Sequence, residues 1–449
     1  MKKLLVIGYV WPEPNSSAAG SHMLSLIQLF KEQGWQVTFA SPAVKSGFEF
    51  DLESIGILVE SIKLNCDSFN QFCHSLRPDA VLFDRFMMEE QFGWRVELSC
   101  PDAVRILDTE DLQCLRDARH RLVKSSSDEI NKLEPNAETD SLNNITVKNN
   151  TVKKITVKNV TFTKSDILNP KIKHLSDIAL REIAAIFRSD LSLIISSFEF
   201  DWLKTNFSIP EQQLLHIPFL VNQAEKEFTH FKNRKNFISI GNFRHAPNWD
   251  SVLQLKSLWP SIRHQLPEAE LHIYGAYTPP KATALNDSKG GFIIKDRAES
   301  ALNVIRHARV LLAPLRFGAG IKGKLMDAMM VGTPSVTTPI GAEGMQVSEH
   351  WPGAVVDNSA EFVQRAVELY QDEQLWTRSQ NKIVDTLSTN FDYQSIASRL
   401  IQRIDAVVEN PSDHRAHLFF NAMFRYHSMR STEFMSRWID LKNKLQAEE

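Results

Sequence analysis

A glycine-rich loop in the second half of the chain has the residue types best suited to chemistry. Gly318 and Gly320 follow a hydrophobic run, and a segment with helical spacing of apolar residues comes next. Three cations, Arg316, Lys322 and Lys324, lie beside these glycines. Backbone N–H groups at a helix start, positions without a Cβ and fixed positive charges together suit a diphosphate. We therefore expect a diphosphate to bind here; a tight turn with solvated lysines is the alternative.

A carboxylate, Asp327, lies one turn into that predicted helix. Helix propensity alone would not favour aspartate at this position. A ribose bound next to the diphosphate would present two hydroxyl donors to it. We expect Asp327 to accept hydrogen bonds from a sugar hydroxyl, and an ion pair with Lys324 three residues earlier is the alternative.

Four more candidate residues occupy loops that follow predicted strands of the second half. They are Arg244, Gly275, Asp296 and Glu343. Each alone is a weak signal, since any loop can contain an arginine or a glycine. The carboxyl ends of strands in an open α/β sheet line one crevice, however, so we expect all four to contact the same ligand.

The first half of the chain offers a small-residue loop and an acidic cluster. The loop ends at Gly20, at the start of a predicted helix, where a ligand could approach closely. It is not a dinucleotide fingerprint, and no phosphate-binding P-loop motif occurs in the chain. Asp108 and Glu110 follow a predicted strand, and either could accept a proton from a hydroxyl. Helix capping or pairing with nearby arginines explains these acids equally well.

These residues need a framework of parallel strands, and the hydrophobic pattern predicts one twice. Strands alternate with helices over 2–218, and the alternation starts again at 237–338. The pattern predicts an α/β fold with two Rossmann-like, doubly wound domains that face each other across a cleft. We assign 1–225 to the first domain, 226–395 to the second and 396–449 to a C-terminal helical segment.

The segment 124–173 interrupts the first series of strands and helices. It is rich in Ser, Asn and Lys and repeats an Ile-Thr-Val-Lys-Asn unit at 145–149 and 155–159. We interpret it as a low-complexity insertion that forms a small hairpin or stays disordered.

Composition narrows the classes of function. The 449 residues include 51 basic and 54 acidic side chains, and this balance argues against a dedicated nucleic-acid-binding protein. No apolar run reaches the roughly 18 residues needed to span a bilayer. The four cysteines form no Cys-x-x-Cys pair, which favours reduced thiols and a cytoplasmic location over a disulfide framework or a zinc site.

The chain resembles the group 1 glycosyltransferases (glycosyltransferase family 4), which have the two-domain GT-B fold. The motifs that carry the resemblance are Leu271-His-Ile-Tyr-Gly275, the block 313–329 and Gly341-Ala-Glu-Gly344. It extends over residues 1 to about 408 without the insertion. The resemblance implies that a sugar passes from a nucleotide-diphosphate sugar to an acceptor hydroxyl, with the donor on the second domain and a glycan or lipid-linked acceptor on the first.

The resemblance also implies details of mechanism. Family 4 enzymes retain the anomeric configuration and typically need no bound metal or other cofactor. In this chain Arg244, Lys322 and Lys324 would offset the charge on the leaving diphosphate. The family often has two acids eight positions apart; the second is Asp327 here, and Ala319 occupies the position of the first.

The role of that first acid would pass to Arg316 or Lys322. We expect these two residues to be catalytic, together with Asp108 and Glu110. The leading hypothesis is a hexosyltransferase of polysaccharide or glycolipid assembly. An epimerase of the UDP-GlcNAc 2-epimerase type and a non-catalytic sugar-nucleotide-binding module are the alternatives.

Aromatic residues are frequent near the C-terminus, between 414 and 445, where they alternate with Arg and His. Such a segment could lie on a membrane surface near a lipid-linked acceptor. A helix that packs back across the domains is the alternative, and we favour it.

Overall fold

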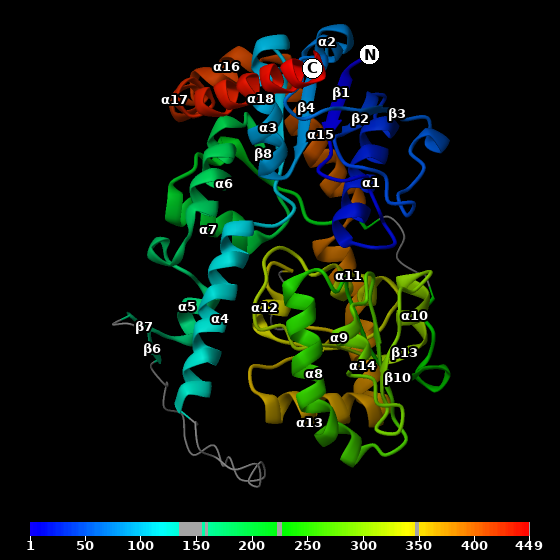
Figure 1. Ribbon diagram of the computed structural model, residues 1–449. Helices are drawn as coiled ribbons and strands as arrows, with labels where there is room; N and C mark the ends of the chain where they lie inside the picture. The colour runs from blue at the N-terminus through cyan, green and yellow to red at the C-terminus, as the bar shows by residue number, and fades with distance from the viewer. Residues whose placement is uncertain (134–154, 158–159, 222–226, 346–349, 449) are drawn as a thin grey trace.

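Two parallel α/β sheets form the frame of the protein. The computed structural model describes residues 1–133, 155–157, 160–221, 227–345 and 350–448, and Figure 1 shows the two sheets in separate domains, one above the other. Their strand orders are β3-β2-β1-β4-β5-β8-β9 and β12-β11-β10-β13-β14-β15. In both, the order reverses between the first and the fourth strand. The predicted fold of two doubly wound domains is confirmed.

The first sheet contains seven strands. They are β1 (Lys3–Ile7), β2 (Gln36–Ser41), β3 (Leu58–Ser61), β4 (Ala80–Asp84), β5 (Val104–Asp108), β8 (Leu191–Ile194) and β9 (Leu214–His216). The helices of this part are α1 (Ala18–Glu32), α2 (Ser68–Leu76), α3 (Arg85–Ser99), α4 (Gln113–Leu133), α5 (Lys164–Leu168), α6 (Asp177–Arg188) and α7 (Ser197–Phe207).

The second sheet contains six strands. They are β10 (Lys235–Ile240), β11 (Leu271–Tyr274), β12 (Phe292–Ile294), β13 (Ala308–Ala313), β14 (Ser335–Thr337) and β15 (Gly353–Val355). The helices around it are α8 (Ala246–Gln265), α9 (Pro280–Thr283), α10 (Ala301–His307), α11 (Gly323–Met330), α12 (Pro339–Ala342), α13 (Ser359–Gln371) and α14 (Glu373–Asn390).

Both faces of each sheet are buried, as parallel strands require. Successive side chains of a strand point to opposite faces, so Leu5 and Ile7 of β1 join one core cluster while Leu4 and Val6 join another. The sequence therefore shows the central strands as continuous apolar runs.

The predicted insertion contains both helix and hairpin. Helix α4 continues past residue 124 to Leu133, and β6 (Ile155–Val157) pairs antiparallel with β7 (Val160–Phe162). This pair confirms the hairpin alternative for its part of the segment. The first copy of the repeat, 145–149, lies outside the described residues.

Four helices end the chain, and they return to the first domain. They are α15 (Tyr393–Glu409), α16 (Pro411–Ala416), α17 (Phe419–Ser428) and α18 (Arg430–Glu448). Ile396, Leu400 and Ile404 of α15 lie in the same core cluster as β1. The predicted single helix from Leu418 is two helices, which meet at Met429.

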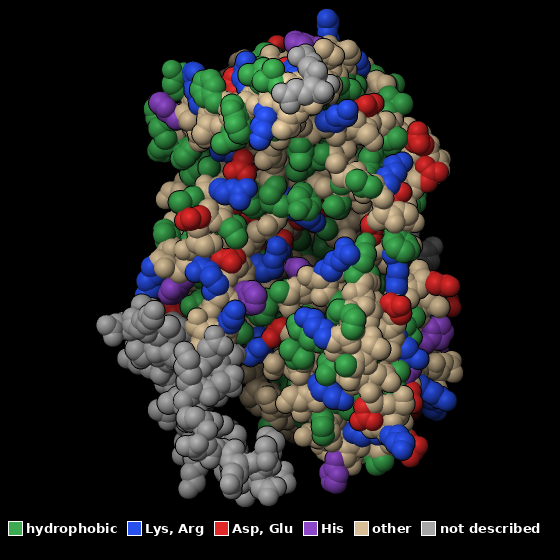
Figure 2. Space-filling model, viewed as in Figure 1, with side chains coloured by type: hydrophobic (Ala, Val, Ile, Leu, Met, Phe, Trp, Pro, Cys, Tyr) green, Lys and Arg blue, Asp and Glu red, His purple; other side chains and the backbone are tan. Residues whose placement is uncertain are grey.

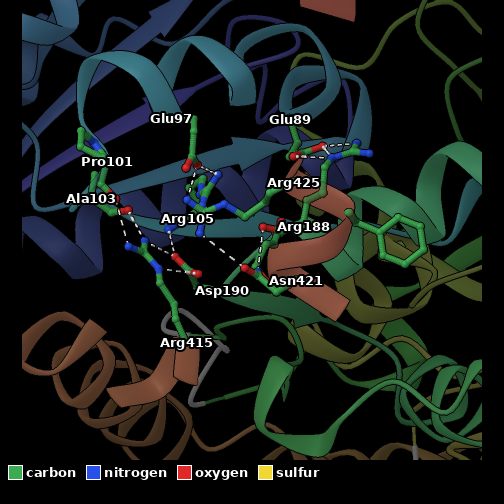
Figure 3. A network of polar contacts seen from close by, with 12 residues as sticks. Glu89, Glu97, Pro101, Ala103, Arg105, Arg188, Asp190, Arg415, Asn421 and Arg425 are labelled. Atoms are coloured by element: carbon green, nitrogen blue, oxygen red, sulfur yellow. Dashed lines mark hydrogen bonds and ion pairs between the residues drawn. The ribbon is translucent and has the colours of Figure 1, made fainter. Parts of the chain in front are cut away.

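Buried ion pairs attach these helices to the first domain (Figure 3). Arg415 of α16 donates to Asp190 at 2.7 Å and to the carbonyl of Ala103 at 2.7 Å. Arg425 of α17 pairs with Glu97 of α3. The prediction that this segment packs against the domains is confirmed for the described residues.

Candidate active site

The predicted diphosphate loop joins β13 to α11 at the carboxyl edge of the second sheet. Gly320 has φ +64°, and a Cβ there would lie 2.8 Å from the Cβ of Asp111 in the first domain. Glycine is therefore needed both for the backbone conformation and for the close approach of the two domains. Lys322 is the N-cap residue of α11, so the positive end of the helix faces the same region as the lysine side chain.

Two lysines of this loop lie in protein surroundings that disfavour their charge. Burial lowers the pKa of Lys322, whose ammonium donates to the carbonyl of Gly320 at 2.6 Å. Burial also lowers the pKa of Lys324 to about 8, and its ammonium donates to Asn248 Oδ1 at 2.9 Å. Both cations are held in place, and an anion that joined them would restore the charged form.

Asp327 lies on the next turn of α11, half-buried. Burial raises the pKa of its carboxyl to about 7. A hydroxyl donor would lower that value again by stabilising the carboxylate. The position and the pKa of Asp327 are compatible with the predicted contact to a sugar.

The other predicted residues of the second domain have partners of their own. Arg316 donates to Asp250 of α8, with Nε 3.0 Å from Oδ2. The Arg244 guanidinium lies 3.7 Å from the ring centre of Tyr277. Asp296 accepts a hydrogen bond from Thr278 at 3.0 Å, and Gly275 is buried beneath the ring of Phe243. Their roles toward a ligand stay predictions.

The acids of the first domain follow two neighbouring strands, β4 and β5. Asp84 and Asp108 are paired in register across these strands and are both buried. Burial raises the pKa of Asp108 to about 7, and the nearby Asp84 raises it further in the same direction. Burial and Asp108 also raise the pKa of Glu110 well above its usual value.

Arg85 lies among these acids and was not among the predicted site residues. Burial disfavours its charge, but four surrounding carboxyls outweigh that effect and raise its pKa. Arg85 and Glu110 both have positive φ, at +69° and +59°. Non-glycine residues in this conformation are strained, and such strain is concentrated at functional sites. Two strained residues at adjacent strand ends support a functional role for this edge.

A buried histidine, His22 of α1, lies behind the acids. Its Nε2 is 3.6 Å from Asp108 Oδ2, and burial lowers its pKa to about 4, so the ring is neutral. Neither ring nitrogen of His22 has a hydrogen-bond partner among the described residues, and Asp108 Oδ2 has none either. These groups retain hydrogen-bonding capacity that a hydroxyl-bearing ligand or a water molecule can satisfy.

Direct contacts across the cleft bring the two sets of residues together. Arg119 of α4 donates to both carboxylate oxygens of Glu343, at 2.7 and 2.6 Å, and to the carbonyl of Gly318 at 2.8 Å. Glu199 of α7 accepts from the N–H groups of Leu112 and Gly320, at 3.1 and 2.8 Å. The donor residues predicted at 318, 320 and 343 thus also join the domains.

Glu199 was missed by the sequence analysis, although its signal was present. Ser196 and Glu199 have the spacing of a capping box at the start of α7, a pattern that explains an acid without any function. In the structure burial raises the pKa of Glu199 to about 8, and its Oε2 has no hydrogen-bond partner among the described residues.

Two helix N-termini, one from each domain, meet at the cleft. Gly20, in the first turn of α1, donates its N–H to Ser17 at 3.1 Å. A Cβ on Gly323, at the start of α11, would lie 2.2 Å from the Cβ of Ala18. Figure 2 shows the surface hollowed between the domains, with Lys and Arg side chains around the hollow. The positive ends of two helices and these cations favour an anionic group between the domains.

His245, in the loop after β10, also belongs to this cleft. The surrounding protein and the nearby Arg116 lower its pKa to about 4, against the opposing effect of Asp111. The arrangement thus offers cations for a diphosphate on one side, and carboxyls for a hydroxyl on the other. It can hold a phosphate-activated group against a nucleophilic hydroxyl.

Comparison with known proteins agrees with this geometry. Residues 234–372 match the family described as Glycosyl transferases group 1. The second domain belongs to the group 1 glycosyltransferases. The match spans β10 to α13 and includes the loop between β13 and α11. No curated protein matches the chain at a significant level.

Solved structures of glycosyltransferases share the fold of the whole chain. TarM from S. aureus has a TM-score of 0.62 and 8% identity, over 90% of this chain and 99% of that one. Sucrose-phosphate synthase from Thermosynechococcus elongatus has a TM-score of 0.61 and 12% identity, over 91% and 100%. HepE from Anabaena has a TM-score of 0.58 and 12% identity, over 90% and 100%. The chain is a glycosyltransferase with the GT-B fold.

Proposed function

We propose that this glycosyltransferase moves a sugar from a nucleotide-diphosphate sugar to a hydroxyl of a glycan or a lipid-linked acceptor. The observation that carries the proposal is the loop between β13 and α11, where Lys322, Lys324 and the N-terminus of α11 converge. The TarM structure contains UDP, and the HepE structures contain UDP with glucose or UDP-glucose. These neighbours support a nucleotide sugar as the donor.

The chemistry follows from the two sides of the cleft. The lysines of the second domain bind the diphosphate and stabilise the charge that develops as the sugar leaves. Asp108 and Glu110 of the first domain face the acceptor, and a carboxylate there takes the proton of the attacking hydroxyl. Because the lysines neutralise the leaving group, we propose that transfer needs no metal.

We further propose retention of the anomeric configuration and a place in polysaccharide or glycolipid assembly. The enzyme would act in the cytoplasm, in peripheral contact with the inner face of the membrane. None of the described helices combines the length and apolar character that crossing a bilayer requires.

A thermal-shift screen over UDP-, GDP-, ADP- and dTDP-sugars tests the proposal. A donor at about a hundred times its Kd stabilises the fold by about 2.7 kcal/mol, which raises the Tm by several degrees. The Lys322→Ala variant should lose this shift. Release of free nucleotide that depends on an acceptor supports transfer, and interconversion of the sugar without an acceptor would contradict it.

A further inference from the structure

The last two helices of the chain expose an apolar face. On α18 the exposed residues are Phe434, Met435, Trp438, Leu441 and Leu445. Four of them follow the spacing 434, 438, 441 and 445, which places them on one side of a helix. Each is more than half exposed. We call the exposed sides of α17 and α18 the C-terminal face.

Helix α17 extends this face. Phe419, Phe420 and Tyr426 are exposed at 75%, 51% and 61%. Figure 2 shows hydrophobic side chains gathered over α17 at the upper left. The two helices together provide eight of the twenty large hydrophobic side chains that are exposed in the described part of the chain. Such a concentration marks an interaction surface, since scattered single residues need no explanation.

The opposite sides of both helices are fixed to the first domain. The buried Ser436 of α18 accepts from Arg95 at 3.2 Å, and α18 packs against α3. On α17 the buried Asn421 donates to the carbonyls of Arg188 and Ser189, at 2.9 and 3.0 Å. Arg425 and Arg415 add the ion pairs of Figure 3. The outward direction of the aromatic residues is therefore set by buried polar contacts.

Charges on α18 are sorted in the same sense. Glu433 and Asp440 are turned inward, with side-chain exposures of 22% and 13%. Their partners four residues later, Arg437 and Lys444, are exposed at 56% and 58%. The surface thus presents its cations and withholds its acids.

Further cations stand beside the aromatic rings. The Lys442 ammonium lies 5.6 Å from the ring centre of Trp438, and the Arg430 guanidinium lies 5.0 Å from that of Tyr426. Aromatic side chains interleaved with Lys and Arg are the composition that favours a bilayer interface, where rings enter the headgroup region and cations meet phosphates.

We propose that the C-terminal face binds the surface of a membrane that contains anionic phospholipid. The inference rests on the proposed function, because it supplies the contact surface for the proposed peripheral location. In Figure 1, α16, α17 and α18 lie at the end of the first domain away from the second. The face would therefore hold the first domain at the lipid and leave the second domain clear of it.

Vesicle flotation tests the proposal with the full chain. Wild-type protein should float with vesicles of phosphatidylcholine containing about 30% phosphatidylglycerol, and bind less to pure phosphatidylcholine, because anionic lipid attracts the cations. The triple variant Phe434→Ser/Trp438→Ser/Leu441→Ser should lose about fivefold or more of the bound fraction. The matched control is Leu253→Ser/Val384→Ser, which removes two exposed apolar residues of the second domain.

The outcomes separate this surface from the active site. The triple variant should keep the wild-type Tm and the wild-type thermal shift with a nucleotide sugar. Flotation without any nucleotide-sugar response would refute the proposed function and leave the surface inference intact. Wild-type protein that does not float, or a triple variant that floats as well as the wild type, would overturn the inference. Self-association abolished by the triple variant, without lipid binding, would overturn it in favour of a second copy of the chain.

Discussion

The two sides of the cleft have the same architecture and opposite charge. In each domain the ligand-facing edge lies where the strand order reverses, beside β1 and β4 in the first and beside β10 and β13 in the second. The first domain places Asp84, Asp108 and Glu110 there, and the second places Lys322 and Lys324. The fold thus fixes where a ligand binds, and the side chains of a few loops fix which ligand it is.

The difference also determines which group each side stabilises. The lysines favour the diphosphate, and a bound diphosphate favours the charged lysines. The acids, by contrast, raise one another's pKa, and burial adds to that effect. The first domain therefore contains a costly charge arrangement that an acceptor hydroxyl can use, while the second contains cations that its ligand stabilises.

Removing the cations should break this contrast most strongly. The variant Lys322→Ala/Lys324→Ala should lower kcat/KM for the donor by about 10²–10³, because charge stabilisation of the leaving group is lost. Initial rates at varied donor concentration measure this effect. Lys281→Ala, an exposed lysine of the same domain outside the loop, is the control. A donor KM and a kcat both within twofold of wild type would show that the diphosphate binds elsewhere.

Neutralising one acid should have the opposite effect on stability and activity. Asp108→Asn should lower acceptor-dependent transfer by about 10²-fold, the loss expected for a general base, and leave the donor Kd unchanged. Transfer rates and donor titrations with the same preparation measure both quantities. Asp102→Asn, at an exposed position before β5, is the control and should change neither.

The same variant should gain stability at alkaline pH. The folded-state pKa of Asp108, about 7, exceeds the value of 3.8 for a free aspartate, so the folded state binds more protons between these values. The free energy of unfolding therefore falls as the pH rises from about 4 to about 7, and the full penalty persists above 7. Asp108→Asn removes it, so its Tm gain should be larger at pH 8 than at pH 5. An equal change at both would contradict the raised pKa.

The smallest expected effect is a pH dependence within the donor site itself. Burial raises the pKa of Asp327 to about 7 and lowers that of Lys324 to about 8. Donor affinity should be highest between these values, falling below pH 7 as Asp327 is protonated and above pH 8 as Lys324 loses its proton. Calorimetric titration from pH 6 to 9 should show changes of at most about tenfold per unit.

Two variants assign the limbs of that profile. Lys324→Arg keeps a permanent charge and should extend binding to higher pH. Asp327→Asn should weaken binding a few-fold and abolish the decline below pH 7. A Kd that stays constant from pH 6 to 9 would remove both residues from the donor site.

The sequence predicted the fold and the loop between β13 and α11 because both depend on local patterns. Buried parallel strands are apolar runs, and the Gly-x-Gly-x-Lys-x-Lys segment has the composition of a strand-to-helix turn at an anion site. Periodicity also separated most helices from strands. It did not show the break at Met429, because the apolar spacing continues across it.

The contacts across the cleft could not be predicted in the same way. Arg119 and Glu343 are 224 positions apart, and nothing in either local pattern indicates that they form a bidentate pair. Arg316 stands beside the glycines in sequence, yet its guanidinium pairs with Asp250 on another helix. Such partners are set by tertiary structure, which a single sequence does not specify.

The return of α15 to the first domain has a consequence for biosynthesis. Ile396, Leu400 and Ile404 fill the core beside β1, so the first domain is built from both ends of the chain. The second domain is continuous in sequence and leaves the ribosome before α15. Since domains generally fold as units during synthesis, the second domain can reach its final structure first, although it is made later than β1 to β9. Until the last helices emerge, the first domain has an open apolar surface and depends on chaperones or on a slow ribosome-bound stage to avoid aggregation.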